Sequence, residues 1–519
     1  MNAETAYLFR HALLRDAGYQ LQLPGDRARL HLLALEILES LCGGRPPAPP
    51  PLTGADRRAL PPHASDPYAE DLASHAASAE QAFGVERTSS SSEEIADLRR
   101  IYTRRAAEFA LAQYRQHAAL RLWRELAELV PGAERCEALR HAAVAGVHSG
   151  QMKLAEELFD RALPMAREAC ALEAEGRLLG GLGSLYLATG RVQEAEAAYE
   201  RTLALCRETG NMREAGIALG NLAALYKNTG NLQRAEASHL RALETHRQFA
   251  NRRSEAVTLA NLANVYQDTG RFELAERTFE QALAIHEEFG DRRFYGLAIG
   301  NLGCLLQDLG RTGEAERSLL RALAIHREIG DRRYEGMTTG NLALVYEKTG
   351  RVGDAETHYA RALEIHREVS NRASEGIVLA NLAGLYRSTG RPRLAADTLE
   401  QALSIHREVG NRRSVGISLG VLAALKIDDG LLEEAERLME DSLAIHRETG
   451  NRHYEGLTLC DMAALLVRRR RAEDARKTWQ SGVELMKSLG ENVSLEVSRV
   501  NMIEACREAG VPPLDEDPA

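Results

Sequence analysis

Features that would mark an enzyme, a metalloprotein or a membrane protein are scarce in this sequence. The seven cysteines are scattered and form no C-x-x-C pair, which argues against a disulfide framework or a zinc ribbon. No apolar run approaches the roughly 18 residues of a membrane helix, and residues 1–19 lack the basic-then-apolar order of a signal peptide. No G-x-x-x-x-G-K-S/T phosphate loop or H-E-x-x-H zinc motif occurs. We therefore expect a cytoplasmic protein that is not an enzyme and uses no cofactor or metal.

Basic character is also missing. Charged residues make up 27% of the 519 positions and the net charge is −10, which argues against a nucleic-acid partner and, with the hydropathy, against a membrane partner. Arginine far outnumbers lysine, a bias typical of GC-rich bacterial genomes. A chain of this length would ordinarily form two to four domains, but an internal period overrides that expectation, because a repeat array is one continuous body.

One phrase recurs along the chain and defines the period. "ALAIHREIGDRR" begins at Ala322, and close copies separated by steps of 40 residues begin at Ala242, Ala282, Ala362, Ala402 and Ser442. Within one unit, apolar residues recur at helical spacing, Gly270 and Gly290 end two successive helices, and Asp291 offers an N-cap to the next helix. The pattern predicts a helical hairpin repeated every 40 residues.

Two columns of small residues indicate how the hairpins pack. Small residues let two helices approach closely, while the large side chain that follows fills the gap beside them. The first column is Ala195, Ala235, Ala275, Ala315, Ala355, Ala395, Ala435 and Ala475, followed four residues later by Tyr199, His239, Phe279, Leu319, Tyr359, Leu399, Met439 and Trp479. The second is Ala242, Ala282, Ala322, Ala362 and Ala402.

This pattern resembles the tetratricopeptide repeat (TPR), in which Leu-Gly/Ala-x-x-Tyr precedes Gly and then Ala-x-x-x-aromatic-x-x-Ala. It is matched in order by Leu262, Ala263, Tyr266, Gly270, Ala275, Phe279 and Ala282. The 40-residue period, longer than the usual length of about 34, is similar to the repeats of the polarity adaptor Pins and of kinesin light chain. The resemblance covers residues 134–490 and implies an all-α, right-handed superhelical solenoid of antiparallel helix hairpins. It also implies a non-enzymatic scaffold or adaptor that binds a partner protein or peptide.

The first part of the chain resembles the helical region that follows the nucleotide-binding domain in bacterial STAND-type signalling ATPases. The resemblance implies a nucleotide-binding protein as a further partner. It also implies an alternative function, as a sensor or regulatory arm split or truncated from such an ATPase. The matching residues are Phe9, Arg10, His11, Ala12, Leu13, Tyr19, Leu23, Arg27, Leu30 and His31, then 69–73 and His75.

These patterns divide the chain into six parts. Two of them contain low-complexity linkers, "GGRPPAPPPL" at 43–52 and "ERTSSSSEE" at 86–94, which we expect to be extended and mobile respectively. The predicted parts are a helical segment at 1–43, a Pro-rich linker at 44–66, a helical region with a degenerate repeat at 67–133, the solenoid at 134–490, a capping helix at 491–510 and an acidic tail at 511–519.

Histidines occupy another column, at His246, His286, His326, His366, His406 and His446. Zinc ligands must lie within about 2.0–2.3 Å of one ion, whereas equivalent residues of stacked helices lie at least roughly 8–10 Å apart. We therefore interpret the histidines as structural, each able to bond the last carbonyls of its helix and complement the dipole. The arginines after each cap, such as Arg332 and Arg333, are interpreted as a rim of ion pairs with nearby glutamates; a surface for an acidic partner is the alternative.

A column of asparagines is the leading candidate for a binding site. These residues lie inside the first helix of each hairpin, where asparagine is a mediocre helix former, and Gly or Ala precedes each of them. The TPR resemblance implies that this stripe lines the concave face and that its amides bind the main chain of an extended peptide, as an asparagine ladder. The alternative is that the amides bond a neighbouring helix and set the repeat spacing. The predicted site comprises Asn221, Asn261, Asn301, Asn341 and Asn381, with Asn264 beside them and a polar lip of Lys227, Gln267, Gln307 and Arg387.

Overall fold

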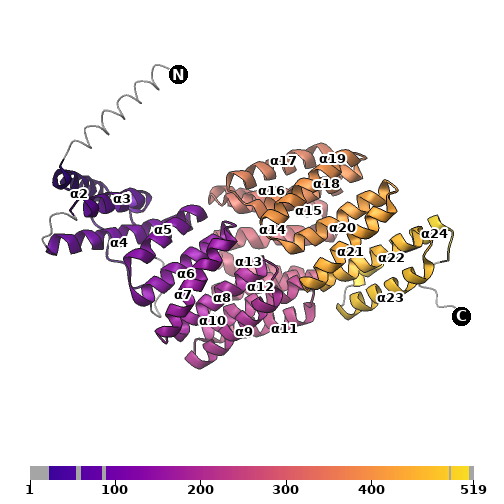
Figure 1. The fold of residues 1–519 in the computed structure, drawn as a ribbon, viewed down its shortest axis with the longest axis horizontal. Coiled ribbons are helices and arrows are strands. Elements are labelled where there is room, and N and C mark those ends of the chain that lie inside the picture. The colour runs from indigo at the N-terminus through magenta and orange to yellow at the C-terminus, as the bar shows by residue number, and fades with distance from the viewer. Residues whose placement is uncertain (1–22, 54–59, 84–88, 490–491, 513–519) are drawn as a thin grey trace, which may run out of the picture. The chain divides into compact units, whose positions relative to one another are not determined.

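Helices form nearly all of the chain in the computed structural model, which describes residues 23–53, 60–83, 89–489 and 492–512 (Figure 1). No strand occurs within these ranges. Consecutive helices pack against each other in antiparallel hairpins, which confirms the all-α TPR-type solenoid. The residues pack as two compact units, 1–174 and 175–519.

The first turns of one helix in the first unit lie in the segment predicted to be a Ser-rich linker. Ser89–Glu94 form the start of α4 rather than a mobile connection, so that prediction was wrong. Serine and glutamate are both accepted in the first turn of a helix, which explains the error. The helices of this unit are α2 (Pro24–Leu41), α3 (Ala69–Phe83), α4 (Ser89–Ala112), α5 (Gln116–Leu129), α6 (Gly132–His148) and α7 (Met152–Glu168), with a short 3-10 turn at Asp66–Tyr68.

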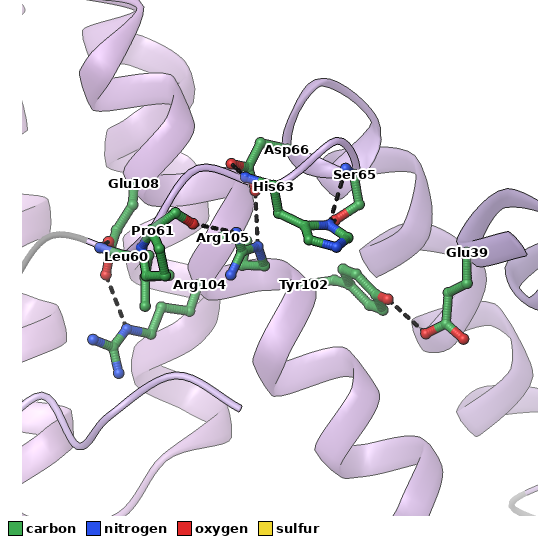
Figure 2. A network of polar contacts seen from close by, with 10 residues as sticks. All are labelled: Glu39, Leu60, Pro61, His63, Ser65, Asp66, Tyr102, Arg104, Arg105 and Glu108. Carbon is green, nitrogen blue, oxygen red and sulfur yellow. Dashed lines mark hydrogen bonds and ion pairs between the residues drawn. The ribbon is translucent and has the colours of Figure 1, made fainter. Parts of the chain in front are cut away.

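A buried polar network holds the Pro-rich segment of the first unit against α4 (Figure 2). Arg105 is 1% exposed and donates hydrogen bonds to Asp66 at 2.8 Å and to the carbonyl of Pro61 at 3.0 Å. Tyr102, also fully buried, donates to the carboxylate of Glu39 at 2.5 Å. Buried charges are retained only when they are paired and hydrogen-bonded in this way, so this part of the Pro-rich segment is fixed by α4.

The second unit is a continuous series of hairpins. It begins within α8 and each later helix of the series is 17 or 18 residues long. The helices are α8 (Leu172–Ala188), α9 (Val192–Thr209), α10 (Met212–Asn228), α11 (Leu232–Gln248), α12 (Arg252–Asp268), α13 (Phe272–Glu288), α14 (Arg292–Asp308), α15 (Thr312–Glu328), α16 (Arg332–Lys348), α17 (Val352–Glu368), α18 (Arg372–Ser388), α19 (Pro392–Glu408), α20 (Arg412–Asp428), α21 (Leu432–Glu448), α22 (Arg452–Arg468), α23 (Ala472–Leu489) and α24 (Asn492–Ala509).

The helix ends follow the predicted turn chemistry. Gly270 and Gly290 adopt φ values of 71° and 61°, the left-handed conformation that closes a helix at low cost for glycine. Arg470 adopts the same conformation with φ 59°, as its position in the glycine column requires. The Asp291 side chain accepts a hydrogen bond from the backbone N–H of Phe294 at 3.5 Å, which confirms the aspartate N-cap, and Asp331 accepts one from Tyr334 at 3.3 Å.

The small-residue columns lie where the helices touch. All eight alanines of the first column are fully buried, and the large residue four positions later is buried in every copy. In one hairpin, Ala315 and Leu319 pack against the core that continues through Leu342 and Tyr346. Because protein interiors are close-packed, these positions have no space for a larger side chain.

Replacing Ala315 with leucine should therefore destabilise the second unit by about 1–3 kcal/mol. Ala324 is exposed on the same helix, α15, so Ala324→Leu is the matched control and should change stability by less than about 0.5 kcal/mol. Chemical denaturation of both variants measures the difference. Equal stability of the two variants would show that Ala315 does not lie at a tight helix contact.

Candidate binding groove

The asparagine column lies along successive first helices of the second unit. Each of its five amides is exposed or half-buried, and none makes a hydrogen bond with any residue that the structure describes. Asn264, one turn further along α12, is half-buried and likewise without such a bond. The amides lie on α10, α12, α14, α16 and α18 at Asn221, Asn261, Asn301, Asn341 and Asn381. No bond from the column to a neighbouring helix is therefore present among the described residues.

The residues before the asparagines differ in the space that they leave. A methyl group added at Gly220 would meet no atom within 4 Å, whereas Gly300 is buried and a methyl group there would touch Ala322 at 3.6 Å. Glycine is the residue that allows close approach of another backbone. The stripe therefore combines unbonded amides with open space at Gly220.

Lip residues of the predicted site bind the next hairpin. Lys227 pairs with Asp268 at 2.8 Å, Gln267 donates to Asp308 at 2.7 Å, and the charges of Arg387 and Asp428 lie 2.5 Å apart. Gln307, the fourth lip residue, is 9% exposed. The predicted site did not include these aspartates, although each follows its partner by 41 residues, one period plus one, and that spacing was the available signal.

Two cavities occur where the second unit returns to its own earlier hairpins. The backbone N–H of Arg452 donates to the carbonyl of Thr229 at 3.3 Å, and Gln233 donates to the carbonyl of Leu489 at 3.3 Å. A cavity of 620 Å³ next to this junction is lined by residues of α8, α18 and α20 that include Asn381. A second cavity, of 510 Å³, is lined in part by Lys227 and Gln267. The other predicted site residues do not line these two cavities.

Histidines of the repeated phrase turn inward rather than toward their own helix end. Each of the six is 1–2% exposed, and each Nδ1 has no hydrogen-bond partner. A methyl group at Gly336 would lie only 2.6 Å from Cε1 of His366, and Gly376 and His406 show the same spacing. Five of the six rings therefore fill the space left by a glycine in the paired helix, and the position equivalent to that glycine is Ala256 for His286. The structural interpretation of the column holds, but the bonding to the last carbonyls was wrong.

Burial also keeps these rings neutral. Desolvation lowers the pKa of His366, of His406 and of His446 to about 4, and nearby Arg333 and Arg413 add to the effect at His366 and His446. Burial lowers the pKa of His246, His286 and His326 as well. A neutral ring does not complement the helix dipole, so packing is the main contribution of the column.

Arginines of the same phrase form the predicted ion-pair rim. Glu335 is 3% exposed and accepts from Arg327 at 3.0 Å and from Arg332 at 2.5 Å, and Arg332 also pairs with Glu368. The arrangement recurs at Glu255 and Glu375. Burial alone would raise the pKa of Glu255. The hydrogen bonds from its two arginines outweigh burial, so the pKa is lowered. These clamps join each hairpin to the next.

No group of three or more histidine, cysteine, aspartate or glutamate side chains within the described ranges is arranged to hold a metal ion. None of the described helices is both long enough and apolar enough to cross a lipid bilayer.

Comparison with known families identifies the repeat. The sequence matches the family described as tetratricopeptide repeat over residues 134–208, 214–288, 254–328 and 334–408, and a second description of the same repeat over 416–449. The first match alone covers more than half of the chain, so this chain belongs to the tetratricopeptide-repeat family. Residues 1–133 lie outside both matches, and Phe9–Tyr19 lie outside the described residues, so the resemblance to STAND-type ATPases stays a prediction.

Several solved structures are similar in part. BtubC (BKLC) from P. vanneervenii is 24% identical, with 42% of this chain and 91% of that chain covered and a TM-score of 0.36. A Rap protein complexed with competence and sporulation factor is 14% identical, with 67% of this chain and 99% of that chain covered and a TM-score of 0.49. The apo form of the quorum sensor NprR from B. thuringiensis is 16% identical, with 65% of this chain and 95% of that chain covered and a TM-score of 0.41. At these values none bears on what this chain binds. The search of curated proteins found no match.

Proposed function

We propose that this chain is a non-enzymatic scaffold that binds an extended segment of a partner protein, or a peptide, along the asparagine column. The observation that carries the proposal is the row of amides without intramolecular bonds. A primary amide donates to a carbonyl and accepts from an N–H, which is the pattern that a bound main chain offers. Each amide is exposed or half-buried, so a ligand backbone would replace its bonds to water, with a net gain of about 0.5–1.5 kcal/mol for each bond.

The surroundings of the column support a backbone ligand in particular. Gly220 leaves open space at the helix surface, so that a main chain can approach the neighbouring amide closely. Lys227, Gln267 and Arg387 are occupied by aspartates of the next hairpin. In this proposal the lip residues fix the spacing of the hairpins, and the asparagines are left free to bind the ligand.

Affinity capture with the full chain, followed by mass spectrometry, tests this function. We expect a captured partner whose binding is competed by one synthetic peptide, about ten residues long, from a single region of that partner. Competition only by a folded domain of the partner would contradict the proposal. A nucleotide-binding protein held through residues 23–133 would instead support the alternative function, as an arm split from a signalling ATPase.

A further inference from the structure

Arg413 is a cation that lines the 620 Å³ cavity and the 510 Å³ cavity beside Lys227 and Gln267. It lies at the start of α20, and its Nε is buried without a hydrogen-bond partner. It forms no ion pair with any residue that the structure describes; its guanidinium carbon lies 5.9 Å from the centre of the Tyr454 ring. The carboxylate of Asp268, which acts on Arg413 electrostatically, is held by Lys227 at 2.8 Å. Leaving a cation partly buried and unpaired is costly.

The repeat itself shows which partner is missing. Arg293 occupies the position equivalent to Arg413 three periods earlier, and its Nε donates to the carboxylate of Asp331 at 3.1 Å. The residue equivalent to Asp331 beside Arg413 is Asn451. Asn451 is 1% exposed, and neither its Oδ1 nor its Nδ2 has a hydrogen-bond partner. A neutral amide therefore stands where the sibling hairpin has a carboxylate.

The 620 Å³ cavity suits a ligand that supplies this carboxylate. None of the described residues that line it is acidic. Ile377 and Ile417 give it apolar walls, Ser414 and Ser418 offer hydroxyl groups, and Asn381 belongs to the asparagine column. An arginine–carboxylate bond shielded by such walls is stronger than one in open solvent.

We propose that Arg413 binds a carboxylate of the segment held in the groove, either its C-terminal carboxylate or an aspartate or glutamate side chain. The inference rests on the proposed function, because Asn381 links the cavity to the asparagine column. It adds a preference for one chemical class of ligand: a peptide with a carboxylate at the end of the stripe near α18 and α20.

Random heptapeptide pools distinguish the two sources of the carboxylate. Four synthetic pools are passed over the immobilised full chain and retained peptides are quantified by mass spectrometry. The pools contain or lack acidic residues, and end in a free or an amidated C-terminus. We expect retention to require one of the two carboxylates. The proposal would be overturned if the pool that lacks acidic residues and has an amidated C-terminus were retained as well as the other pools. It would also be overturned if no pool were retained.

Two variants test the role of Arg413 itself. Arg413→Gln removes the cation, and Asn451→Asp supplies the carboxylate that the sibling hairpin has, so each should lower retention of carboxylate peptides at least tenfold. Arg253→Gln, an exposed position of the same column, should leave it unchanged. Thermal melting confirms that each variant is folded. Unchanged retention by folded Arg413→Gln and Asn451→Asp would contradict the assignment. If retention of the peptides is then still lost when the asparagines are changed, the proposed function is supported and only the proposed carboxylate site is wrong.

Discussion

Acidification from pH 7 to pH 5 is expected to unfold the second unit, because its buried histidines must accept protons. The pKa of His239, His366, His406 and His446 lies at about 4 in the folded chain, against about 6.5 for an unfolded histidine. The folded-state pKa is lowered, so the unfolded chain binds more protons between these values. The stabilisation is fully present above pH 6.5 and is lost as the pH falls toward 4.

The size of the effect follows from the shift. At pH 5 each such histidine should lower the free energy of unfolding by roughly 2 kcal/mol. Four of them together approach the whole stability of an ordinary domain, about 5–15 kcal/mol. Circular dichroism and denaturant titrations between pH 7.5 and pH 4 measure this loss.

The histidine column supplies its own control. Met486 occupies the equivalent position in a later hairpin and packs against Gly456 as the histidines pack against their glycines. His366→Met and His406→Met together should reduce the loss at pH 5 by about 4 kcal/mol, while His358→Met, at a half-buried position outside the column, should not. A pH dependence that is the same in the double variant and in the wild type would show that other groups cause the unfolding.

The triple change of Asn261, Asn301 and Asn341 to alanine should lower affinity for the captured segment at least tenfold. Each lost hydrogen bond costs about 0.5–1.5 kcal/mol, and 1.4 kcal/mol corresponds to a factor of ten. The same change should leave stability intact or slightly raise it, because alanine is the better helix former and no intramolecular bond is removed. Calorimetry for binding and thermal melting for stability measure the two effects.

The two readouts separate the two interpretations of the column. If the asparagines were spacers between hairpins, the triple variant would be destabilised while its folded fraction bound the segment normally. The matched control is Thr245→Ala, Thr278→Ala and Thr357→Ala, on the second helices, whose hydroxyls bond only carbonyls of their own helix. These changes should leave the affinity unchanged.

Local rules made most of the fold predictable. Gly270, Asp331 and Ala315 each have a role set by a few neighbouring residues, a turn, a cap or a helix contact, and such roles can be inferred from one repeat unit. The repetition then extended the inference along the chain. The helix at Ser89–Glu94 was missed because serine-rich composition indicates a linker as readily as a helix start.

Features that depend on how hairpins accumulate could not be predicted. The bond from Arg452 to Thr229 joins residues more than 200 positions apart, and its formation depends on the small rotation between each pair of hairpins. The cavity that contains Arg413 and Asn381 arises from the same accumulation. The pairing of Lys227 with Asp268 was within reach of the sequence, since it repeats at a fixed spacing, but each partner alone is an ordinary surface residue.

The most direct test of the asparagine ladder is an N-methylation scan of the captured segment. Methylation removes a backbone N–H while keeping every side chain, so only a site that binds the main chain should respond at alternate positions. We predict that N-methylation at alternate positions lowers affinity about threefold to tenfold, and that one of these losses disappears in Asn301→Ala. If every N-methylated position is tolerated while side-chain changes abolish binding, the asparagines do not bind the main chain and the proposed ladder is wrong.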